Sequence, residues 1–427
     1  MPLLVHELDW FEAGNEKVLG ELALDLSDDD YVCYVFGRDA LGRFRAVWLD
    51  HSIPTADEAR ARLTVKIAEC AKMPLEEFYQ GDEVGKPIDF FTPVVKPLAL
   101  SPDFKALVSQ QGYSPAFGLI SEMMHYFKDV DGNFVQQFQT SGFSPRFWEL
   151  YLYALFTELG YGFKREYPTP DFHCQGLLGD FFVEATTVNP SDSAPRIDAS
   201  NEKAYFESYV PIKFGSALFS KLNKEYWKLR HVKGHPLVFA IQDFHVPMSM
   251  SWSSSALPEY LYGIRQTDKK KPDGAIEIVS EKIESYTWSD GKETKTIPSN
   301  FFSQPNTEHV SAVLANSEGT ISKFNRMGFL AGFGDRTLKM IRTGLCYSDS
   351  VVPAKFEFEV HAPDYAESWA QGVSVYHNPN AKEPLPPEAM PGVAHCCSKE
   401  GRVVAKKPKF HTFGSITHII QRNSSRP

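Results

Sequence analysis

The segment Gly179–Val188 reads Gly-Asp-Phe-Phe-Val-Glu-Ala-Thr-Thr-Val and places a carboxylate, Glu184, in the middle of an apolar, strand-like run. Alternation along a β-strand puts Glu184 on the same face as Asp180 and Thr186. A carboxylate in such a strand costs free energy unless a cation or hydrogen-bond donors meet it. We therefore expect a charged partner for Glu184, and the simplest one is a divalent metal ion held by oxygen ligands at the end of a mixed sheet.

Two further carboxylates lie close to this strand in the sequence. Asp171 ends a second strand-like segment over residues 163–172, and Glu149 is the one mid-helix carboxylate of an apolar helix expected over residues 146–159. The spacing lets the helix end and a hairpin form before Glu184, so Asp171 and Glu184 can converge at a strand end. We predict that Glu149, Asp171 and Glu184 bind Mg²⁺ or Mn²⁺.

The chain has 427 residues, which is long enough for more than one domain. We expect an α/β protein, α+β overall, with a mixed-sheet core over residues 141–250 in the order helix, strands, helix, strand. Residues 1–140 are expected to form an N-terminal α+β domain that senses, dimerises or recruits, and a homodimer is compatible with this. Residues 251–310, rich in Ser and Lys, are expected to be a long insertion, and residues 311–427 to supply strands that complete or extend the core.

This pattern resembles the PD-(D/E)xK nuclease superfamily, whose core is restriction-endonuclease-like. Pro170-Asp171 matches the first half of its motif, Glu184-Ala-Thr186 stands at the second half, and Glu149 corresponds to the helical carboxylate of many members. The resemblance covers about a quarter of the chain. It implies a phosphodiesterase in which Asp171 and Glu184 hold Mg²⁺, which polarises the phosphate and activates a water.

The chain departs from the motif at Thr186, where the family has a lysine. Threonine cannot supply positive charge, so we expect Lys221 or Lys224, on a helix predicted over residues 215–229, to stand in for it. Lys221, Lys224 and Lys228 would share one face of that helix. Such a stripe suits contacts with a nucleic-acid backbone, but it is also typical of a solvated helix face.

Simpler interpretations of the acidic residues stay open. Asp171 can cap a turn, and Glu149 can form a buried salt bridge with Arg146 or Arg165. Asp180 is a rival ligand to Asp171, although it lies two pleats away from Glu184 along the strand.

Composition and motifs exclude several other classes. The net charge of −10 argues against a basic surface over the whole molecule, although it allows a local basic groove. The six cysteines show no regular framework, the N-terminus has no signal-peptide pattern, and no apolar run could span a bilayer, so we expect a cytoplasmic protein without a membrane partner. Zinc-site spacing, a nucleophile elbow, a P-loop and a dinucleotide fingerprint are all missing from the sequence.

The leading prediction is therefore a Mg²⁺- or Mn²⁺-dependent nuclease that acts on nucleic acid, DNA more readily than RNA. Defence against foreign DNA is the setting suggested by analogy of fold alone. A second hypothesis, favoured by Thr186, is a catalytically degenerate relative that binds nucleic acid or a protein partner. A third is an α/β fold unrelated to nucleases, in which the acidic residues are structural.

Overall fold

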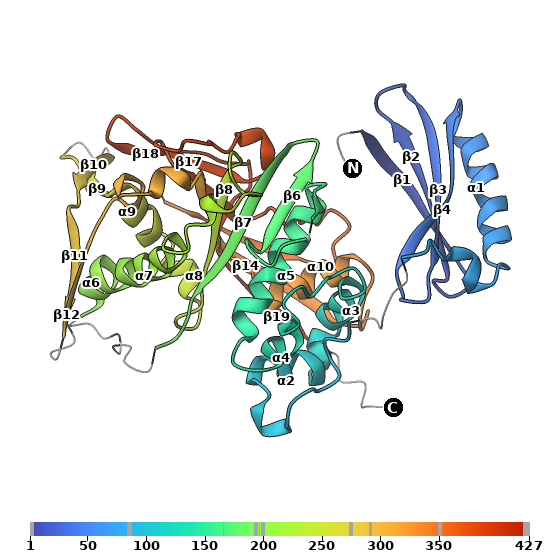
Figure 1. Ribbon diagram of the computed structural model, residues 1–427, viewed down its shortest axis with the longest axis horizontal. Helices are drawn as coiled ribbons and strands as arrows, with labels where there is room; N and C mark the ends of the chain where they lie inside the picture. The colour runs from blue at the N-terminus through green and yellow to red at the C-terminus, as the bar shows by residue number, and fades with distance from the viewer. Residues whose placement is uncertain are drawn as a thin grey trace. The chain divides into compact units, whose positions relative to one another are not determined.

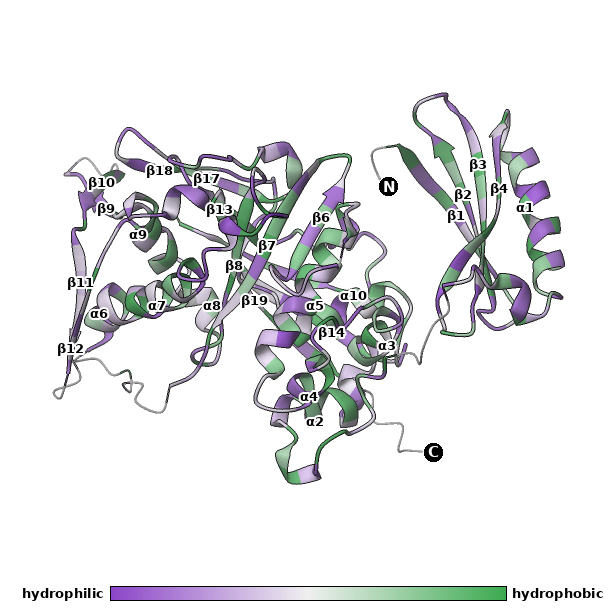
Figure 2. Ribbon diagram, in the orientation of Figure 1, coloured by the Kyte–Doolittle hydropathy of each residue, from purple (hydrophilic) through white to green (hydrophobic). Residues whose placement is uncertain are grey.

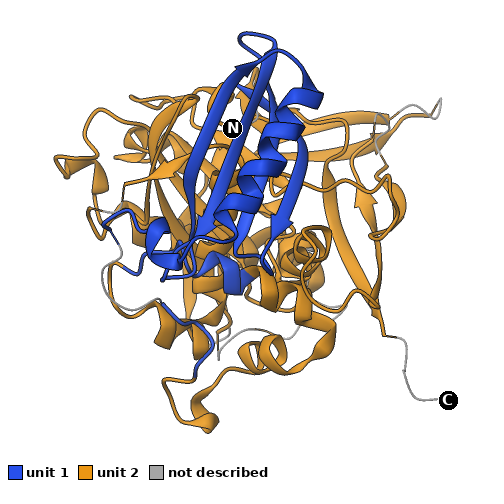
Figure 3. Ribbon diagram, turned by 90° about the vertical axis from the view of Figure 1, so that its right-hand side faces the viewer, with its two compact units in different colours: residues 1–92, 120–129 blue, residues 93–119, 130–427 orange. Residues whose placement is uncertain are grey.

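The chain forms two compact units, residues 1–92 with 120–129 and residues 93–119 with 130–427 (Figure 3). The computed structural model describes residues 4–82, 88–164, 166–191, 195, 197, 201–272, 276–289, 293–348 and 352–421. We expected an N-terminal domain ending near residue 140. Residues 93–119 instead belong to the larger unit, where the backbone N–H of Ala116 donates to Asn325 Oδ1 at 3.1 Å.

The smaller unit is an antiparallel sheet in the order β1-β2-β3-β4 with one helix packed on it. Its elements are β1 (Val5–Ala13), β2 (Val18–Asp25), β3 (Asp30–Arg38), β4 (Phe44–Ile53) and α1 (Ala56–Cys70). Thr55 caps α1 by accepting a hydrogen bond from the backbone N–H of Glu58, as the Thr-x-x-Glu pattern predicts. Leu63 and Ile67 of α1 are buried in the core of this unit.

The larger unit is built on an eight-stranded mixed sheet in the order β18-β17-β16-β13-β8-β7-β6-β5. Its strands are β5 (Gly162–Phe163), β6 (Phe172–Gly176), β7 (Gly179–Val188), β8 (Leu237–Asp243), β13 (Ala312–Asn316), β16 (Val373–His377), β17 (Ala394–Lys399) and β18 (Arg402–Lys406). Strand β6 pairs antiparallel with both β5 and β7, whereas β7, β8 and β13 are parallel to one another. All seven residues of β8 are buried, which is typical of a central parallel strand.

Helices pack on both faces of this sheet, α5 (Phe143–Glu158) on one and α7 (Val210–Leu222) on the other (Figure 1). Alternation along β7 explains the two contacts, because Phe181 packs edge-on against Phe156 of α5 while Phe182 joins the cluster around Leu218 of α7. Figure 2 shows hydrophobic residues along much of β7 and β8. The predicted order of helix, strands, helix and strand is confirmed.

The segment expected as an insertion, residues 251–310, folds into short helices and hairpins. It contains α8 (Ser249–Trp252), α9 (Ala256–Tyr262) and two short hairpins, β9 (Ile264–Lys270) with β10 (Ile276–Lys282) and β11 (Ser285–Ser289) with β12 (Thr294–Pro298). Tyr260 and Tyr286 from this segment are buried in the same cluster as α7. The segment therefore contributes to the core rather than standing outside it.

The C-terminal third both extends the sheet and forms a second one. Strands β13, β16, β17 and β18 belong to the large sheet, as expected, while a separate three-stranded sheet has the order β15-β14-β19. The elements outside the large sheet are α10 (Ile321–Leu330), β14 (Lys339–Cys346), β15 (Ala354–Glu359) and β19 (Thr412–Ile420). All six cysteines are free. Among the helices of the described ranges, none combines the length and the apolar character that crossing a membrane requires.

Candidate active site

Asp171 and Glu184 lie on neighbouring strands at the same level of the sheet. Phe172 pairs with Val183 in the antiparallel register of β6 and β7, so the preceding residue, Asp171, comes beside Glu184. Asp171 Oδ2 accepts a hydrogen bond from the backbone N–H of Ala185 at 2.7 Å. The predicted convergence of these two carboxylates is therefore present.

Glu184 is 3% exposed, and its two carboxylate oxygens differ in their surroundings. Oε1 accepts hydrogen bonds from Lys221 Nζ at 2.5 Å and from the Tyr226 hydroxyl at 2.7 Å. Oε2 is buried and has no hydrogen-bond partner among the residues that the structure describes. A desolvated carboxylate oxygen without a donor is the kind of atom that a metal ion satisfies.

Lys221 comes from the last turn of α7, which is anchored on the sheet by the buried side chains of Leu218 and Leu222. Burial opposes the charge of Lys221, but the negative charges of Glu184 and Asp171 outweigh it and raise the pKa of the amine. Lys221 therefore stays protonated at neutral pH. Of the two lysines predicted to replace the missing motif lysine, this one reaches the site.

Asp171 is electrostatically strained. Burial and the negative charges of Glu184 and Glu149 raise the pKa of its carboxyl group well above the ordinary value of 3.8, against the opposing effects of Lys221 and of the Ala185 N–H. A bound cation would favour the ionised form of such a group. The raised pKa of Asp171 thus reflects burial first and the negative charges of Glu184 and Glu149 second.

Glu149 is held differently from the other two carboxylates. Arg146 Nη1 donates to both of its oxygens, at 2.9 and 2.8 Å, so the salt bridge with Arg146 is confirmed, while Arg165 lies outside the described residues. Within the described ranges, no three or more His, Cys, Asp or Glu side chains are grouped so that they could hold a metal ion. Asp171 and Glu184 are thus a pair of neighbouring carboxylates, with Glu149 adding negative charge nearby.

Lys224 and Lys228 do not continue the face that carries Lys221. Helix α7 ends at Leu222, Glu225 has a left-handed φ of 54°, and Tyr226–Lys228 form a separate turn of 3₁₀-helix, η5. Lys224 is exposed, and Lys228 binds Glu225 at 2.7 Å. The predicted stripe of three lysines on one helix is therefore wrong.

Tyr226 is the site residue that the sequence did not reveal. It follows a break in a segment that reads as continuous helix, and its hydroxyl reaches Glu184 only because η5 turns the chain back towards the sheet. Burial and the nearby charge of Glu184 raise the pKa of the Tyr226 phenol, so it remains a hydrogen-bond donor.

Asp180 lies near the start of β7, four residues before Glu184. Its carboxylate binds His173 Nε2 at 2.7 Å and also accepts a hydrogen bond from Gln175. Burial raises its pKa, but the bonds from Gln175 and His173 outweigh burial and lower it. Asp180 is thus engaged by other residues and does not replace Asp171 at the site.

The loop that carries Asp171 is fixed from the other side of the sheet edge. His231 Nε2 lies 2.9 Å from the carbonyl oxygen of Thr169, and the ring of Tyr167 stacks on that of His231 with centroids 3.9 Å apart. Together the elements present two neighbouring carboxylates and a protonated lysine in a largely buried setting. This arrangement can hold a divalent cation and place positive charge against an anionic substrate.

No family model, no curated protein and no solved structure matches this chain.

Proposed function

We propose that this protein is a divalent-metal-dependent nuclease that hydrolyses phosphodiester bonds, with DNA as the favoured substrate. The observation that carries the proposal is the buried Glu184, which presents one open carboxylate oxygen beside Asp171 while Lys221 and Tyr226 hold the other. In native proteins most buried carboxylate oxygens have a hydrogen-bond partner. Glu184 is therefore better explained as a ligand than as a structural residue.

Asp171 and Glu184 would hold Mg²⁺ or Mn²⁺, since their oxygen donors suit these hard cations. When bound, the ion would polarise the phosphate and lower the pKa of an attacking water.

Lys221 would replace the motif lysine that is absent at Thr186. Because its pKa is raised, Lys221 carries a positive charge at neutral pH and does not act as a general base. Its contribution would be to attract the non-bridging phosphate oxygens and to stabilise the charge that develops on them. Tyr226 would position Glu184 and leave its open oxygen turned to the ion.

The finer fold assignment belongs to the same proposal. Helix α5, strands β5 to β7, helix α7 and strand β8 follow the order of a restriction-endonuclease-like core. The two carboxylates also fall on the two strands where that core carries its acidic motif. Defence against foreign DNA remains an analogy of fold.

A second candidate is a degenerate relative that binds nucleic acid without cleaving it. Two observations favour it: Thr186 occupies the lysine position, and no group of three potential metal-binding side chains occurs in the described ranges. In that protein Lys221 would neutralise Glu184 permanently instead of assisting a reaction.

Labelled DNA and RNA incubated with and without Mg²⁺ or Mn²⁺ separate the two candidates. We expect metal-dependent cleavage of DNA that Glu184→Gln abolishes and that Lys221→Met lowers about 10²–10³-fold, the usual effect of removing one stabilising group. Lys224→Met is the matched control, because Lys224 is exposed and follows the end of α7, and it should cleave like the wild type. Binding without cleavage under all metal conditions would support the degenerate protein, and cleavage that survives Glu184→Gln would reject this site.

A further inference from the structure

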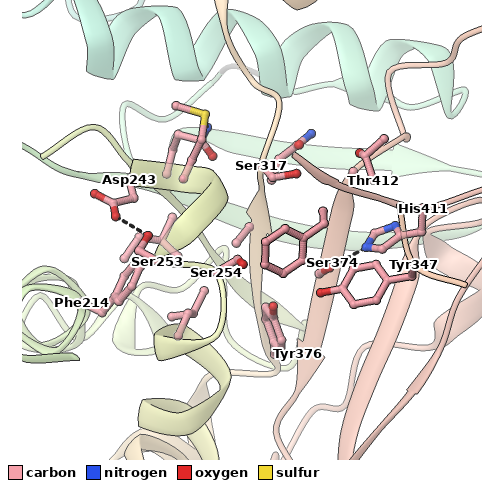
Figure 4. A pocket seen from close by; sticks show the side chains of 18 residues that line it. Phe214, Asp243, Ser253, Ser254, Ser317, Tyr347, Ser374, Tyr376, His411 and Thr412 are labelled. Carbon is pink, nitrogen blue, oxygen red and sulfur yellow. Dashed lines mark hydrogen bonds between the residues drawn. The ribbon is translucent and has the colours of Figure 1, made fainter. Parts of the chain in front are cut away.

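A small pocket lies at the carboxyl ends of β8 and β13, within the larger unit (Figure 4). It has a volume of about 50 Å³, and its walls come from β8, β13, β16 and the segment entering β19. The carboxyl ends of parallel strands are where open α/β sheets usually bind ligands. The pocket is formed by residues other than Asp171, Glu184 and Lys221.

Four buried polar atoms of the lining have no hydrogen-bond partner among the described residues: Gln242 Oε1, Ser317 Oγ, His411 Nδ1 and Thr412 Oγ1. Gln242, His411 and Thr412 are 1%, 3% and 2% exposed. Native proteins pair nearly all such atoms, because each unpaired one costs free energy. Their concentration around one cavity indicates that a polar ligand completes them.

The lining is nearly neutral, which restricts the charge of that ligand. No lysine or arginine lines the pocket as far as the described residues show. Its carboxylate, Asp243, already binds His245 Nδ1 at 2.5 Å and the Ser253 hydroxyl at 2.6 Å. Burial and the nearby Lys407 lower the pKa of His411 to about 4, so this imidazole is uncharged at neutral pH. A phosphate or carboxylate would meet no cation among the described residues of the lining, because Lys407 lies outside it with its Nζ 3.4 Å from the ring centroid of Tyr347.

Aromatic rings form the remaining walls. Tyr347 stacks on His411 with ring centroids 5.4 Å apart, and Tyr376 and Phe413 also face the pocket. Flat aromatic walls with a few hydrogen-bonding groups between them suit a planar, polar ring. The ligand should therefore combine a flat π-surface with N–H and C=O groups along its edge.

Gly372 keeps the cavity open. Its φ is +83°, and a Cβ at this position would lie 2.8 Å from Asn316 Oδ1 and 3.0 Å from Thr412 Oγ1. Glycine alone adopts this backbone conformation without strain and leaves that space empty. The opening in front of Thr412 thus depends on the backbone as well as on the side chains.

We infer that this pocket binds the hydrogen-bonding edge of a nucleobase. The volume gives room for about four water-sized groups, enough for one edge of a ring but not for a whole nucleotide. Gln242 supplies an acceptor for an N–H group, and the hydroxyls of Ser317 and Thr412 can donate to ring carbonyls. The base can come from a free nucleoside or from a nucleic-acid strand.

Gln242 of the pocket and Glu184 of the proposed active site are close along the sheet, but their side chains point to opposite faces. Gln242 pairs with Thr187 across β7 and β8, and Thr187 is three residues beyond Glu184, roughly 10 Å along the strand. The odd spacing turns the Glu184 side chain to the α7 face, like that of Phe182, and the Gln242 side chain to the opposite face, so the pocket and Glu184 are two separate sites. The binding inference itself does not require cleavage and stands independently of the proposed function.

Calorimetric titration of the full chain with uridine, thymidine, cytidine, adenosine and guanosine, and with short DNA and RNA oligonucleotides, tests the inference. We expect saturable binding of at least one base, weakened about five- to tenfold by either Thr412→Val or Ser317→Ala, the usual effect of losing one hydrogen bond. Without ligand, both variants should be as stable as the wild type or more stable, because each removes a hydroxyl that has no partner. Thr412-dependent binding of oligonucleotides alone would identify a strand as the source of the base.

Thr307→Val is the matched control, since the buried Thr307 hydroxyl donates to the Gln304 carbonyl at 2.6 Å away from the pocket. It should lose stability and keep base binding, and Glu184→Gln should also keep base binding. Absence of binding to nucleosides and oligonucleotides alike, binding unchanged in both pocket variants, or equal binding of acetamide, which has no ring, would overturn the inference. Thr412-dependent binding in a protein that cleaves nothing would reject the nuclease proposal and leave this one intact.

Discussion

Glu184 holds its two carboxylate oxygens in unequal environments. Oε1 accepts hydrogen bonds from Lys221 and Tyr226, whereas Oε2 is buried with no partner among the described residues. Leaving one such oxygen unsatisfied costs about 1–3 kcal/mol. Proteins accept costs of this kind mainly at functional sites.

Asp171→Asn should stabilise the metal-free protein at neutral pH by about 0.5–2 kcal/mol, the usual gain from one stabilising substitution. The substitution removes a buried negative charge that lies close to two other carboxylates. Burial and the charges of Glu184 and Glu149 raise the pKa of Asp171 in the folded state, so the folded protein binds a proton that the unfolded chain has lost. Wild-type stability therefore falls as the pH rises from the ordinary value of 3.8 through the raised pKa.

Urea denaturation at about pH 5 and about pH 8 measures this effect, and the advantage of the Asn variant should grow with pH. A variant that is less stable than the wild type at the higher pH would contradict the strain assigned to Asp171.

Tyr226→Phe should lower cleavage about tenfold and stability by about 1–2 kcal/mol, because one hydrogen bond to a charged acceptor is lost while the ring remains. Tyr161→Phe is the control, since the buried Tyr161 hydroxyl donates to the Ala389 carbonyl at 2.7 Å. The control should lose stability without losing activity. Equal losses of activity in both variants would show that Tyr226 acts only through the stability of the fold.

At the scale of elements, a buried ionic cluster joins α10, β14 and the segment that follows β15. Glu367 binds Lys323 at 2.7 Å and Arg326 at 2.8 Å, and Glu318 binds Arg342. All five side chains are at most 2% exposed. Breaking a fully desolvated pair leaves an uncompensated charge, which costs far more than the pair contributes.

Glu367→Ala should therefore destabilise the protein by about 3–5 kcal/mol in urea denaturation. Burial raises the pKa of Glu367, but the charges of Lys323 and Arg326 outweigh burial and hold it well below the ordinary value of 4.5. The ionised Glu367 therefore stabilises the fold at a pH above the pKa of this carboxyl group in the unfolded chain, and the stabilisation is lost as the pH falls through the lower folded-state pKa. The difference in free energy of unfolding between the variant and the wild type should therefore shrink in acid.

Glu69→Ala, which removes an exposed partner of Lys66, is the control and should cost less than about 1 kcal/mol. A comparable loss in both variants would mean that burial of the ionic cluster adds nothing.

Helix α1 could be predicted from the local sequence, but the end of helix α7 could not. Helix α1 has a complete signal, with Thr55 as its cap and Leu63 and Ile67 at helical spacing. The helix predicted over residues 215–229 is too long at its C-terminal end, because α7 ends at Leu222 and Tyr226 contacts Glu184 and Phe239 from a separate turn. Tertiary contacts overrule propensity at such positions.

At the scale of the whole molecule, each unit has its own hydrophobic core. The cluster around Leu63 lies in the smaller unit, and the cluster around Leu218 lies in the larger one. Multidomain chains of this kind usually unfold in more than one step.

Calorimetry should resolve two unfolding transitions. Leu63→Ala should lower the melting temperature of one and Leu218→Ala that of the other. Each substitution should reduce the free energy of unfolding of its own unit by about 2–5 kcal/mol. A single transition that both variants shift together would contradict two separate cores.

The large mixed sheet could be predicted from the sequence, but the separate three-stranded sheet could not. Strands β14 and β19 pair across a long sequence separation, and no local pattern encodes that pairing. The same holds for the pocket of Ser317 and Thr412, whose segments meet only in the folded chain. At the active site, Asp171 and Glu184 could be predicted because a short hairpin joins them, while the choice of Lys221 over Lys224 depended on where α7 ends.

The most direct test of the central claim is a titration of the metal-free protein with Mn²⁺, followed by electron paramagnetic resonance, for the wild type and for Glu184→Gln. We expect the wild type to bind Mn²⁺ in a saturable way, the Glu184→Gln variant to bind at least tenfold more weakly, and Lys224→Met to match the wild type. Mn²⁺ uptake that is absent from the wild type, or that is equal in the wild type and Glu184→Gln, would contradict a metal site at Asp171 and Glu184.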